Sequence, residues 1–460
     1  MNLTKEQQEI YDGKQGATLA KVMQTLVRYG ELFGADGMVP VTSKYNHLVT
    51  SFGLKALAPV YELMNQLIES GNVSKQKFSA DPRPLDPNVP SSFLQDFVFK
   101  NFMYSKQDDY EKQLTQLGIM EKDAYTCTCY MDEVGNTPAM GEVLSWSESS
   151  AVVYANSVLG ARCNRNSGII DLMGSVVGYV PRFGLLTDEG RKATWIVKIE
   201  TTKKPEAQLL GSAIGMKVMA DVPYIVGLDK WLGGELDDAA KTYLKDFGAA
   251  TASNGAVGLY HVENITPEAV KYGKDLIAED AKVYVVDDAE LQRVYESYPV
   301  IWKKKDAKPK LCFMGCPHMS LQQLIDWTEK VSQSLKEAGR TRVCIPTVFT
   351  AAREKAEQVA ATRVAPPGTS EHNTGLAVDI LSGDYYYHHS TMEESFEYDA
   401  EAIWMAEHCA EYGFILRYPK GKQDVTGIIF EPWHFRYVGV EIATYIMENN
   451  LTLEEYLGVA

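Results

Sequence analysis

The sequence predicts an α/β fold with a mostly parallel sheet for its long N-terminal region. Beyond about residue 200, short apolar segments alternate with longer segments of helical periodicity, which is the pattern of strands joined by crossover helices. The 460 residues are 45% hydrophobic and 23% charged, so the chain holds enough apolar side chains for substantial cores. That length also exceeds one ordinary domain, and we expect at least two units.

The predicted elements follow one another without an internal repeat. Apolar periodicity predicts helices over residues 5–33 and 53–70, and the prolines between residues 79 and 90 predict a loop. Strands are predicted at residues 222–228, 255–261, 283–286, 310–314 and 343–349. The helices expected between them cover residues 236–247, 267–277 and 321–338.

Charge and targeting signals narrow the possible partners and the compartment. A formal net charge of −16 argues against nucleic acid or an anionic membrane as a partner, because phosphates require clustered Lys and Arg. Residues 1–9 read as a capped polar helix rather than a secretory signal, and no apolar run is long enough to span a bilayer. The seven cysteines favour thiols or metal ligands over disulfides. We therefore expect a cytoplasmic protein.

The most informative motif lies near the end of the chain. The segment S-E-H-N-T-G-L-A-V-D at residues 370–379 is followed by E-P-W-H at residues 431–434. It offers two imidazoles and one carboxylate, from His372, Asp379 and His434. Three such donors suit Zn²⁺ and leave the fourth tetrahedral position open for water, as a catalytic site requires. The motif therefore predicts a zinc site.

Glu431 is the candidate general base of this site. It precedes His434 by three residues, close enough to reach water activated by the metal without being needed as a ligand. The apolar runs at residues 376–380 and 427–430 read as short strands that would carry these groups at their ends. The aromatic and acidic stretch at residues 384–389 reads as a loop over the site.

Both segments resemble the zinc D-alanyl-D-alanine carboxypeptidase family, over residues 353–460. The resemblance implies a small α+β domain in which His372, Asp379 and His434 bind zinc and Glu431 is the general base. It also implies hydrolysis of a terminal D-Ala-D-Ala peptide bond in peptidoglycan peptides. The family's upstream Ser-Gly-Tyr-Arg-Ser-like segment is not found, so the domain is expected to lack its N-terminal portion. A cell-wall substrate conflicts with the expected compartment.

Two further segments concentrate polar and sulfur chemistry. The first runs from T-C-T-C-Y at residues 126–130 through the polar stretch at residues 141–162. This stretch suits a pocket for a small hydroxy acid, in which the planar guanidinium of Arg162 would bind the carboxylate. A serine-capped helix start is an equally good interpretation. The second is L-C-F-M-G-C-P-H-M-S at residues 311–320, whose cysteines could ligate iron or simply lie in the core.

These segments resemble the catalytic large subunit of aconitase X, over residues 1–352. The resemblance implies an iron-dependent or iron–sulfur hydro-lyase, such as a cis-3-hydroxy-L-proline or phosphomevalonate dehydratase, completed by a small swivel subunit. It implies Cys127 and Cys316 as cluster ligands. The residues that it places near the substrate are Ser147, Glu148, Ser149, Ser150, Asn156 and Arg162.

The resemblance also implies that a part is missing. The third cluster cysteine of the family lies in a later portion that this chain lacks, and Cys344 and Cys409 are outside any matching motif. The chain therefore reads as a fusion joined near residues 352 and 353, without a flexible linker. Three hypotheses remain: a zinc peptidase on an inactive scaffold, a hydro-lyase with an added tail, and a catalytically silent protein.

Overall fold

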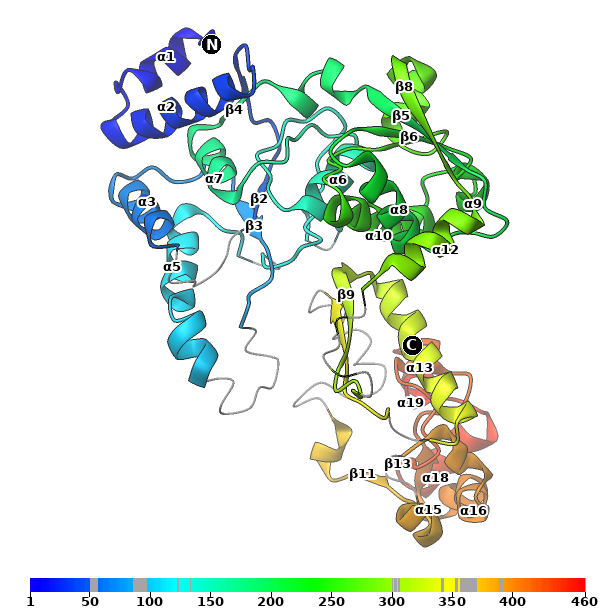
Figure 1. Cartoon of the computed structure of the whole chain (residues 1–460). Helices are drawn as coiled ribbons and strands as arrows, with labels where there is room; N and C mark the ends of the chain where they lie inside the picture. Colours follow the sequence, from blue (N-terminus) through cyan, green and yellow to red (C-terminus); the bar gives the residue numbers. More distant parts are fainter. Residues whose placement is uncertain are drawn as a thin grey trace. The chain divides into compact units, whose positions relative to one another are not determined.

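The chain divides into two compact units (Figure 1). The first comprises residues 1–305 with 316–318, and the second comprises residues 306–315 with 319–460. Each unit is described by itself. The computed structural model describes residues 1–49, 57–85, 97–121, 124–132, 134–299, 301, 304, 307–340, 343–351, 355, 370–388 and 392–459.

A four-stranded parallel sheet organises the C-terminal half of the first unit. Its order is β7-β6-β5-β8, and every neighbouring pair is parallel. The strands are β5 (Ala193–Ile199), β6 (Pro223–Val226), β7 (His261–Val262) and β8 (Ile277–Val286). The predicted α/β class is therefore confirmed. The sequence prediction missed the central strand β5, began β8 six residues too late and gave β7 six residues too many at its start.

Helices α8 (Ala207–Val218) and α10 (Asp238–Asn254) pack against each other in this half (Figure 1). Their backbones approach closely: a Cβ atom added at Gly211 would lie 2.4 Å from the carbonyl oxygen of Phe247. Glycine is therefore required for this packing. The same core includes α6 (Ser149–Ser157) and α12 (Asp288–Ser297).

The N-terminal half of the first unit surrounds a second core. The predicted helix over residues 5–33 is two helices, because Gly13 and Gly16 adopt positive φ angles of 84° and 103° between them. The helices are α1 (Lys5–Tyr11), α2 (Ala17–Leu32), α3 (Ala58–Glu69), α5 (Gln107–Leu117) and α7 (Gly168–Val177). Shorter elements of this unit are η2 (Phe99–Met103), η3 (Gly184–Leu186), η4 (Glu189–Arg191), α9 (Asp229–Leu232), α11 (Pro267–Tyr272) and η5 (Gly273–Leu276).

Parallel strand pairing also brings the polar segments of this half together. Strands β2 (Asn46–Leu48) and β3 (Phe78–Ala80) are parallel, and single parallel bridges join Tyr125 to Ala80 and Trp146 to His47. The segments that lead to Cys127 and Glu148 therefore run in the same direction and end at one edge. An antiparallel pair, β1 (Met38–Pro40) and β4 (Tyr179–Pro181), completes the half.

The second unit begins with a parallel strand pair. Strands β9 (Cys312–Met319) and β10 (Thr347–Ala351) are connected through α13 (Leu321–Glu337). Helix α13 starts with a capping box between Ser320 and Gln323, which satisfies two backbone donors. The helix was predicted to within one residue, whereas the predicted strands end five residues before the end of β9 and start four residues before β10.

A three-stranded antiparallel sheet forms the rest of the second unit and confirms a small α+β fold. Its order is β11-β13-β12. The predicted strand at residues 427–430 is wrong, because Gly427 adopts a left-handed conformation that ends a short helix, and the strand starts later. The elements are η6 (Glu371–Thr374), β11 (Ala377–Asp379), α15 (Gly383–His388), η7 (Glu394–Tyr398), α16 (Ala400–His408), η8 (Cys409–Tyr412), β12 (Phe414–Leu416), α17 (Gln423–Thr426), β13 (His434–Tyr437), α18 (Val440–Glu448) and α19 (Leu453–Leu457).

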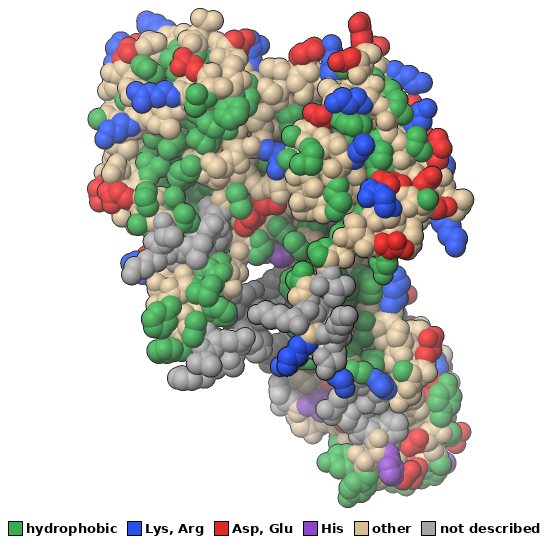
Figure 2. All heavy atoms as spheres, in the orientation of Figure 1, with side chains coloured by type: hydrophobic (Ala, Val, Ile, Leu, Met, Phe, Trp, Pro, Cys, Tyr) green, Lys and Arg blue, Asp and Glu red, His purple; other side chains and the backbone are tan. Residues whose placement is uncertain are grey.

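The surface carries charges of both signs. On the face shown in Figure 2, Lys and Arg side chains lie among Asp and Glu rather than in one large basic cluster. Among the described helices, none has the length and apolar character that a membrane crossing requires.

Candidate functional site

The core of the candidate metal centre is one cross-strand pair. Asp379 at the end of β11 lies directly opposite His434 at the start of β13. Side chains of directly opposed residues project to the same face of a sheet. The Oδ1 atom of Asp379 lies 3.1 Å from Nδ1 of His434. Antiparallel pairing thus brings together two residues that are far apart in the sequence.

The third donor comes from the turn before β11. His372 lies on the single turn η6, and Gly375, with φ of 69°, returns the chain to the strand. The Nδ1 atom of His372 lies 3.2 Å from the carbonyl oxygen of Ala377, which requires the proton on Nδ1. The Nε2 atom of His372 is then an acceptor, and it lies 3.4 Å from Asp379 Oδ1.

The donor atoms of His372, Asp379 and His434 fit a zinc ion. They all lie within 4.8 Å of one another. Donors at about 2.0–2.1 Å from a tetrahedral ion lie roughly 3.3 Å apart, close to the separations seen here. The structure therefore brings together the three side chains that the motif predicted as ligands.

Glu431 lies beside this group. Its Oε2 atom is 3.4 Å from His434 Nδ1. Burial raises the pKa of Glu431 to about 7, helped by the negative charges of Asp379 and Glu371 and opposed by His434. A carboxyl group with a pKa near neutrality can both accept and donate a proton at physiological pH.

Glu371 and Arg417 also belong to the site, and the sequence prediction did not assign them. Glu371 Oε1 accepts a hydrogen bond of 2.8 Å from His434 Nε2, and Glu371 Oε2 accepts one of 3.0 Å from Arg417 Nε. Burial disfavours the charged form of His434, but its contacts with Asp379 and Glu371 outweigh burial and raise the pKa to about 9. The position of Glu371 next to His372 was a usable signal, whereas nothing in the sequence marks Arg417.

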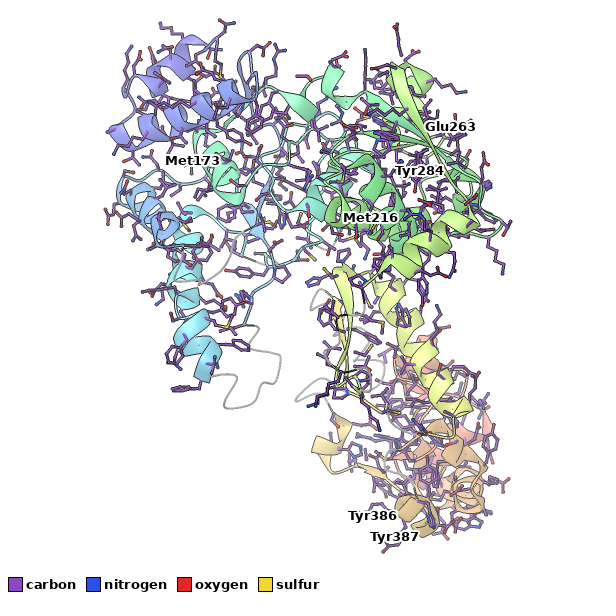
Figure 3. The ribbon with its side chains drawn as sticks, in the orientation of Figure 1. Met173, Met216, Glu263, Tyr284, Tyr386 and Tyr387 are labelled. Carbon is purple, nitrogen blue, oxygen red and sulfur yellow. The ribbon has the colours of Figure 1, made fainter. Side chains whose placement is uncertain are left out.

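The aromatic stretch after β11 differs from its prediction. Residues 383–388 form helix α15 instead of a loop over the site, and His389 lies outside the described residues. Tyr386 and Tyr387 are 67% and 83% exposed and lie at the outer end of the second unit (Figure 3). These two rings point to solvent.

In the first unit, Glu148 is the most unusual of the predicted site residues. It has a φ of 88°, a conformation that non-glycine residues rarely adopt. Its carboxylate caps α6, accepting from the backbone nitrogens of Ser150 at 2.9 Å and Ala151 at 2.5 Å. Burial, together with the charge of Asp81, raises the pKa of Glu148. Strained residues of this kind cluster at functional sites.

The other predicted substrate residues have defined contacts within the protein. Ser150 Oγ donates to Glu148 at 2.6 Å, and Ser149 Oγ lies 3.5 Å from the same carboxylate. Ser147 is buried, and its Oγ accepts a hydrogen bond of 2.7 Å from the backbone nitrogen of Val49, the residue that follows β2. Asn156 binds the backbone of Cys163 and Gly258, and Arg162 pairs with Asp188.

The predicted cluster cysteines differ in their surroundings. Cys127 is partly buried, and its Sγ accepts from the backbone nitrogen of His318 at 3.4 Å, whereas Cys316 is exposed. Burial raises the pKa of the Cys127 thiol to about 12. Cys344 is exposed and contacts Arg340, and Cys409 is buried beside α16.

The described cysteines belong to no group of three potential metal ligands. Within the described ranges, the only group of three or more His, Cys, Asp or Glu donors close enough to hold an ion is the one in the second unit. The described residues of the first unit thus offer no three-ligand set.

Comparisons with known proteins agree with the division of the chain into two units. Family models match the aconitase X first domain at residues 1–189, the aconitase X second domain at residues 193–296 and the D-alanyl-D-alanine carboxypeptidase family at residues 301–440. The phosphomevalonate dehydratase large subunit of Thermococcus kodakarensis is 33% identical over 357 residues, which is 77% of this chain and 82% of that protein. A crystal structure of aconitase X from Thermococcus kodakaraensis in its holo-form is 30% identical, with a TM-score of 0.63, and covers 78% of this chain and 84% of that one.

The C-terminal segment has its own relatives. A D-alanyl-D-alanine carboxypeptidase of Enterococcus faecalis is 50% identical over 109 residues, which is 24% of this chain. The match covers 37% of the length of that carboxypeptidase.

The fold and the comparisons therefore define a chain that joins an α/β region of a hydro-lyase family to a segment of a hydrolase family. The chain belongs to the aconitase X family and carries, fused to it, a segment of the D-alanyl-D-alanine carboxypeptidase family. Both families are enzymes.

Proposed function

We propose that this chain is a zinc-dependent peptidase that hydrolyses a terminal D-Ala-D-Ala peptide bond through its second unit. The observation that carries the proposal is the convergence of His372, Asp379 and His434 within 4.8 Å of one another. Support also comes from the relative of Enterococcus faecalis, which is 50% identical over this segment.

Each side chain of the proposed site has a separate role in the hydrolysis. His372, Asp379 and His434 would hold the ion, which when bound supplies a Lewis acid that polarises the scissile carbonyl and acidifies water. Glu431 takes the proton of the attacking water and transfers it to the amine nitrogen of the departing D-alanine. Its Oε2 atom, 3.4 Å from His434 Nδ1, lies within reach of a water held beside the three ligands.

The test separates metal binding from turnover. In Glu431→Gln we expect the zinc content to stay at the wild-type level, while release of D-alanine from a peptide ending in D-Ala-D-Ala falls about 10²- to 10⁴-fold. Glu411→Gln is a matched control, because Glu411 is exposed and contacts only His408 among the described residues. Full hydrolysis by Glu431→Gln would remove its assignment, and a wild-type chain that binds zinc without hydrolysis contradicts the proposed function.

A second candidate function is dehydration of a small hydroxy acid by the first unit. The observation in its favour is the 33% identity to a phosphomevalonate dehydratase large subunit over 82% of that protein. In this proposal Cys127 and Cys316 are metal ligands, and the six polar residues from Ser147 to Arg162 predicted above lie near the substrate. A large subunit implies a small subunit as its partner. Formation of a carbon–carbon double bond from mevalonate 5-phosphate, with and without a small subunit, tests it.

We also propose that the two regions meet near residues 352 and 353, as predicted from the sequence. Both residues lie outside the described part of the chain. The match to the dehydratase large subunit extends over 357 residues, whereas the carboxypeptidase family model begins at residue 301. Proteolysis with mass spectrometry tests this boundary, because a cut near residue 352 should release a fragment that retains zinc.

A further inference from the structure

A continuous series of charged side chains ends at one imidazole of the candidate metal centre. His434 Nε2 donates to Glu371 Oε1 at 2.8 Å, and the other oxygen of Glu371 accepts from Arg417 Nε at 3.0 Å. Arg417 donates through its two terminal nitrogens to Glu454, at 3.0 and 2.5 Å. Each hydrogen bond uses a different atom of Arg417 or Glu371, so all of them can exist at once.

These side chains come from separate elements of the second unit. Glu371 lies on η6, Arg417 directly follows β12, and Glu454 lies in the first turn of α19. His434 is thus held by its own strand on one side and, through two intervening side chains, by α19 on the other. Elements far apart in the sequence therefore meet at one metal-binding imidazole.

The series is shielded from water along most of its length. The side chains of His434 and Arg417 are 6% and 10% exposed, and those of Glu371 and Glu454 are 16% and 22% exposed. Water screens such charges less than it screens surface pairs. The planar guanidinium of Arg417 binds the carboxylates of Glu371 and Glu454, and its rigid geometry fixes the orientation of both as well as their distance. The guanidinium also lies over the ring of Tyr418 at 4.7 Å.

We propose that Glu371, Arg417 and Glu454 are positioning residues for His434, and that the docking of α19 thereby sets the zinc affinity of the centre. The inference rests on the zinc site proposed above but not on its hydrolytic activity. Glu371 fixes the proton on Nε2 of His434, so that the Nδ1 lone pair faces Asp379 and the ion. Arg417 and Glu454 hold Glu371 in this orientation. Loss of such an outer partner typically changes metal affinity about 10- to 100-fold.

The experiment is a zinc competition titration of the full chain against a chromophoric chelator. We expect Glu371→Gln to weaken zinc binding about 10- to 100-fold, because an amide accepts the imidazole proton less strongly than a carboxylate. We expect a smaller, several-fold loss in Glu454→Gln, which acts through Arg417.

A neighbouring residue provides the matched control. Glu455 also lies in the first turn of α19 and pairs with Lys422 at 2.8 Å, away from Arg417. Gln at this position can still complete the capping box with Thr452. Glu455→Gln should therefore keep wild-type zinc affinity.

The outcomes distinguish positioning from a general effect on stability. Equal losses of thermal stability in the zinc-free Glu454→Gln and Glu455→Gln chains, with unchanged zinc affinity in both, overturn the inference. The double variant Glu371→Gln/Glu454→Gln should bind zinc no more weakly than Glu371→Gln alone, because the residues act in series; additive losses contradict this. A wild-type chain without zinc affinity overturns the inference and the site together, whereas zinc binding without D-alanine release removes only the proposed activity.

Discussion

The predicted metal ligands are arranged differently in the two units. In the second unit, three donors converge within 4.8 Å of one another, and both imidazoles have a hydrogen-bond acceptor on the nitrogen that faces away from Asp379. In the first unit, one predicted cysteine is partly buried and accepts a hydrogen bond from a backbone amide, and the other is exposed. The difference shows that one turn and one strand pair are enough to bring three donors together, whereas the predicted ligands of the first unit come from two separate segments.

The largest expected effect concerns the zinc ligands. His372→Ala should abolish stoichiometric zinc binding, because it removes one of three protein donors. Elemental analysis of the purified chain measures this. His388→Ala is the control, since His388 is an exposed histidine of the same unit that pairs with Asp384. Stoichiometric zinc in His372→Ala would erase the contrast between the two units.

A buried histidine should make the stability of the first unit depend on pH. Burial lowers the pKa of His261 to about 4, whereas an unfolded histidine titrates near 6.5. The unfolded state therefore binds a proton first as the pH falls, and the stabilisation present above pH 6.5 is lost between about pH 6.5 and 4. The loss amounts to about 3 kcal/mol. Denaturant unfolding at several pH values should show a shallower slope in His261→Gln, and an unchanged slope contradicts the assignment.

Helix packing offers a test in which the first unit changes and the zinc centre does not. Gly211→Ala places a Cβ atom 2.4 Å from the Phe247 carbonyl oxygen and should destabilise the first unit by about 1–3 kcal/mol. Gly383→Ala is the control, because a Cβ atom there meets nothing within 4 Å. Denaturation followed by circular dichroism measures the loss, and reduced zinc affinity in Gly211→Ala would show that the units are coupled.

The smallest effect is expected for the exposed cysteine. Cys316→Ser should leave the zinc content unchanged and alter stability by less than about 0.5 kcal/mol, as is usual for exposed positions. Zinc and iron counted after purification without oxygen provide the measurement. Stoichiometric iron in the wild-type chain that disappears in Cys316→Ser would give the first unit a metal centre of its own and reverse the comparison.

The sequence predicted the architecture better than the details of either site. Periodicity and motif spacing identified the α/β region, β11 and the three side chains that the structure brings together, because these depend on local patterns. The strand β13 was placed too early, since the apolar run at residues 427–430 gave no sign that Gly427 ends a helix. Arg417 was missed because its role depends on tertiary contacts with Glu371 and Glu454, which no local pattern records.

The pairing of Asp379 with His434 has a consequence for how the chain matures. Successive side chains of a strand alternate between faces, so a slip of one residue between β11 and β13 would present Val378 or Phe435 where a ligand should be. Only the correctly registered strand pair places both donors of the proposed zinc site side by side. Zinc binding would then stabilise correctly paired chains during folding and would leave mispaired chains without that stabilisation.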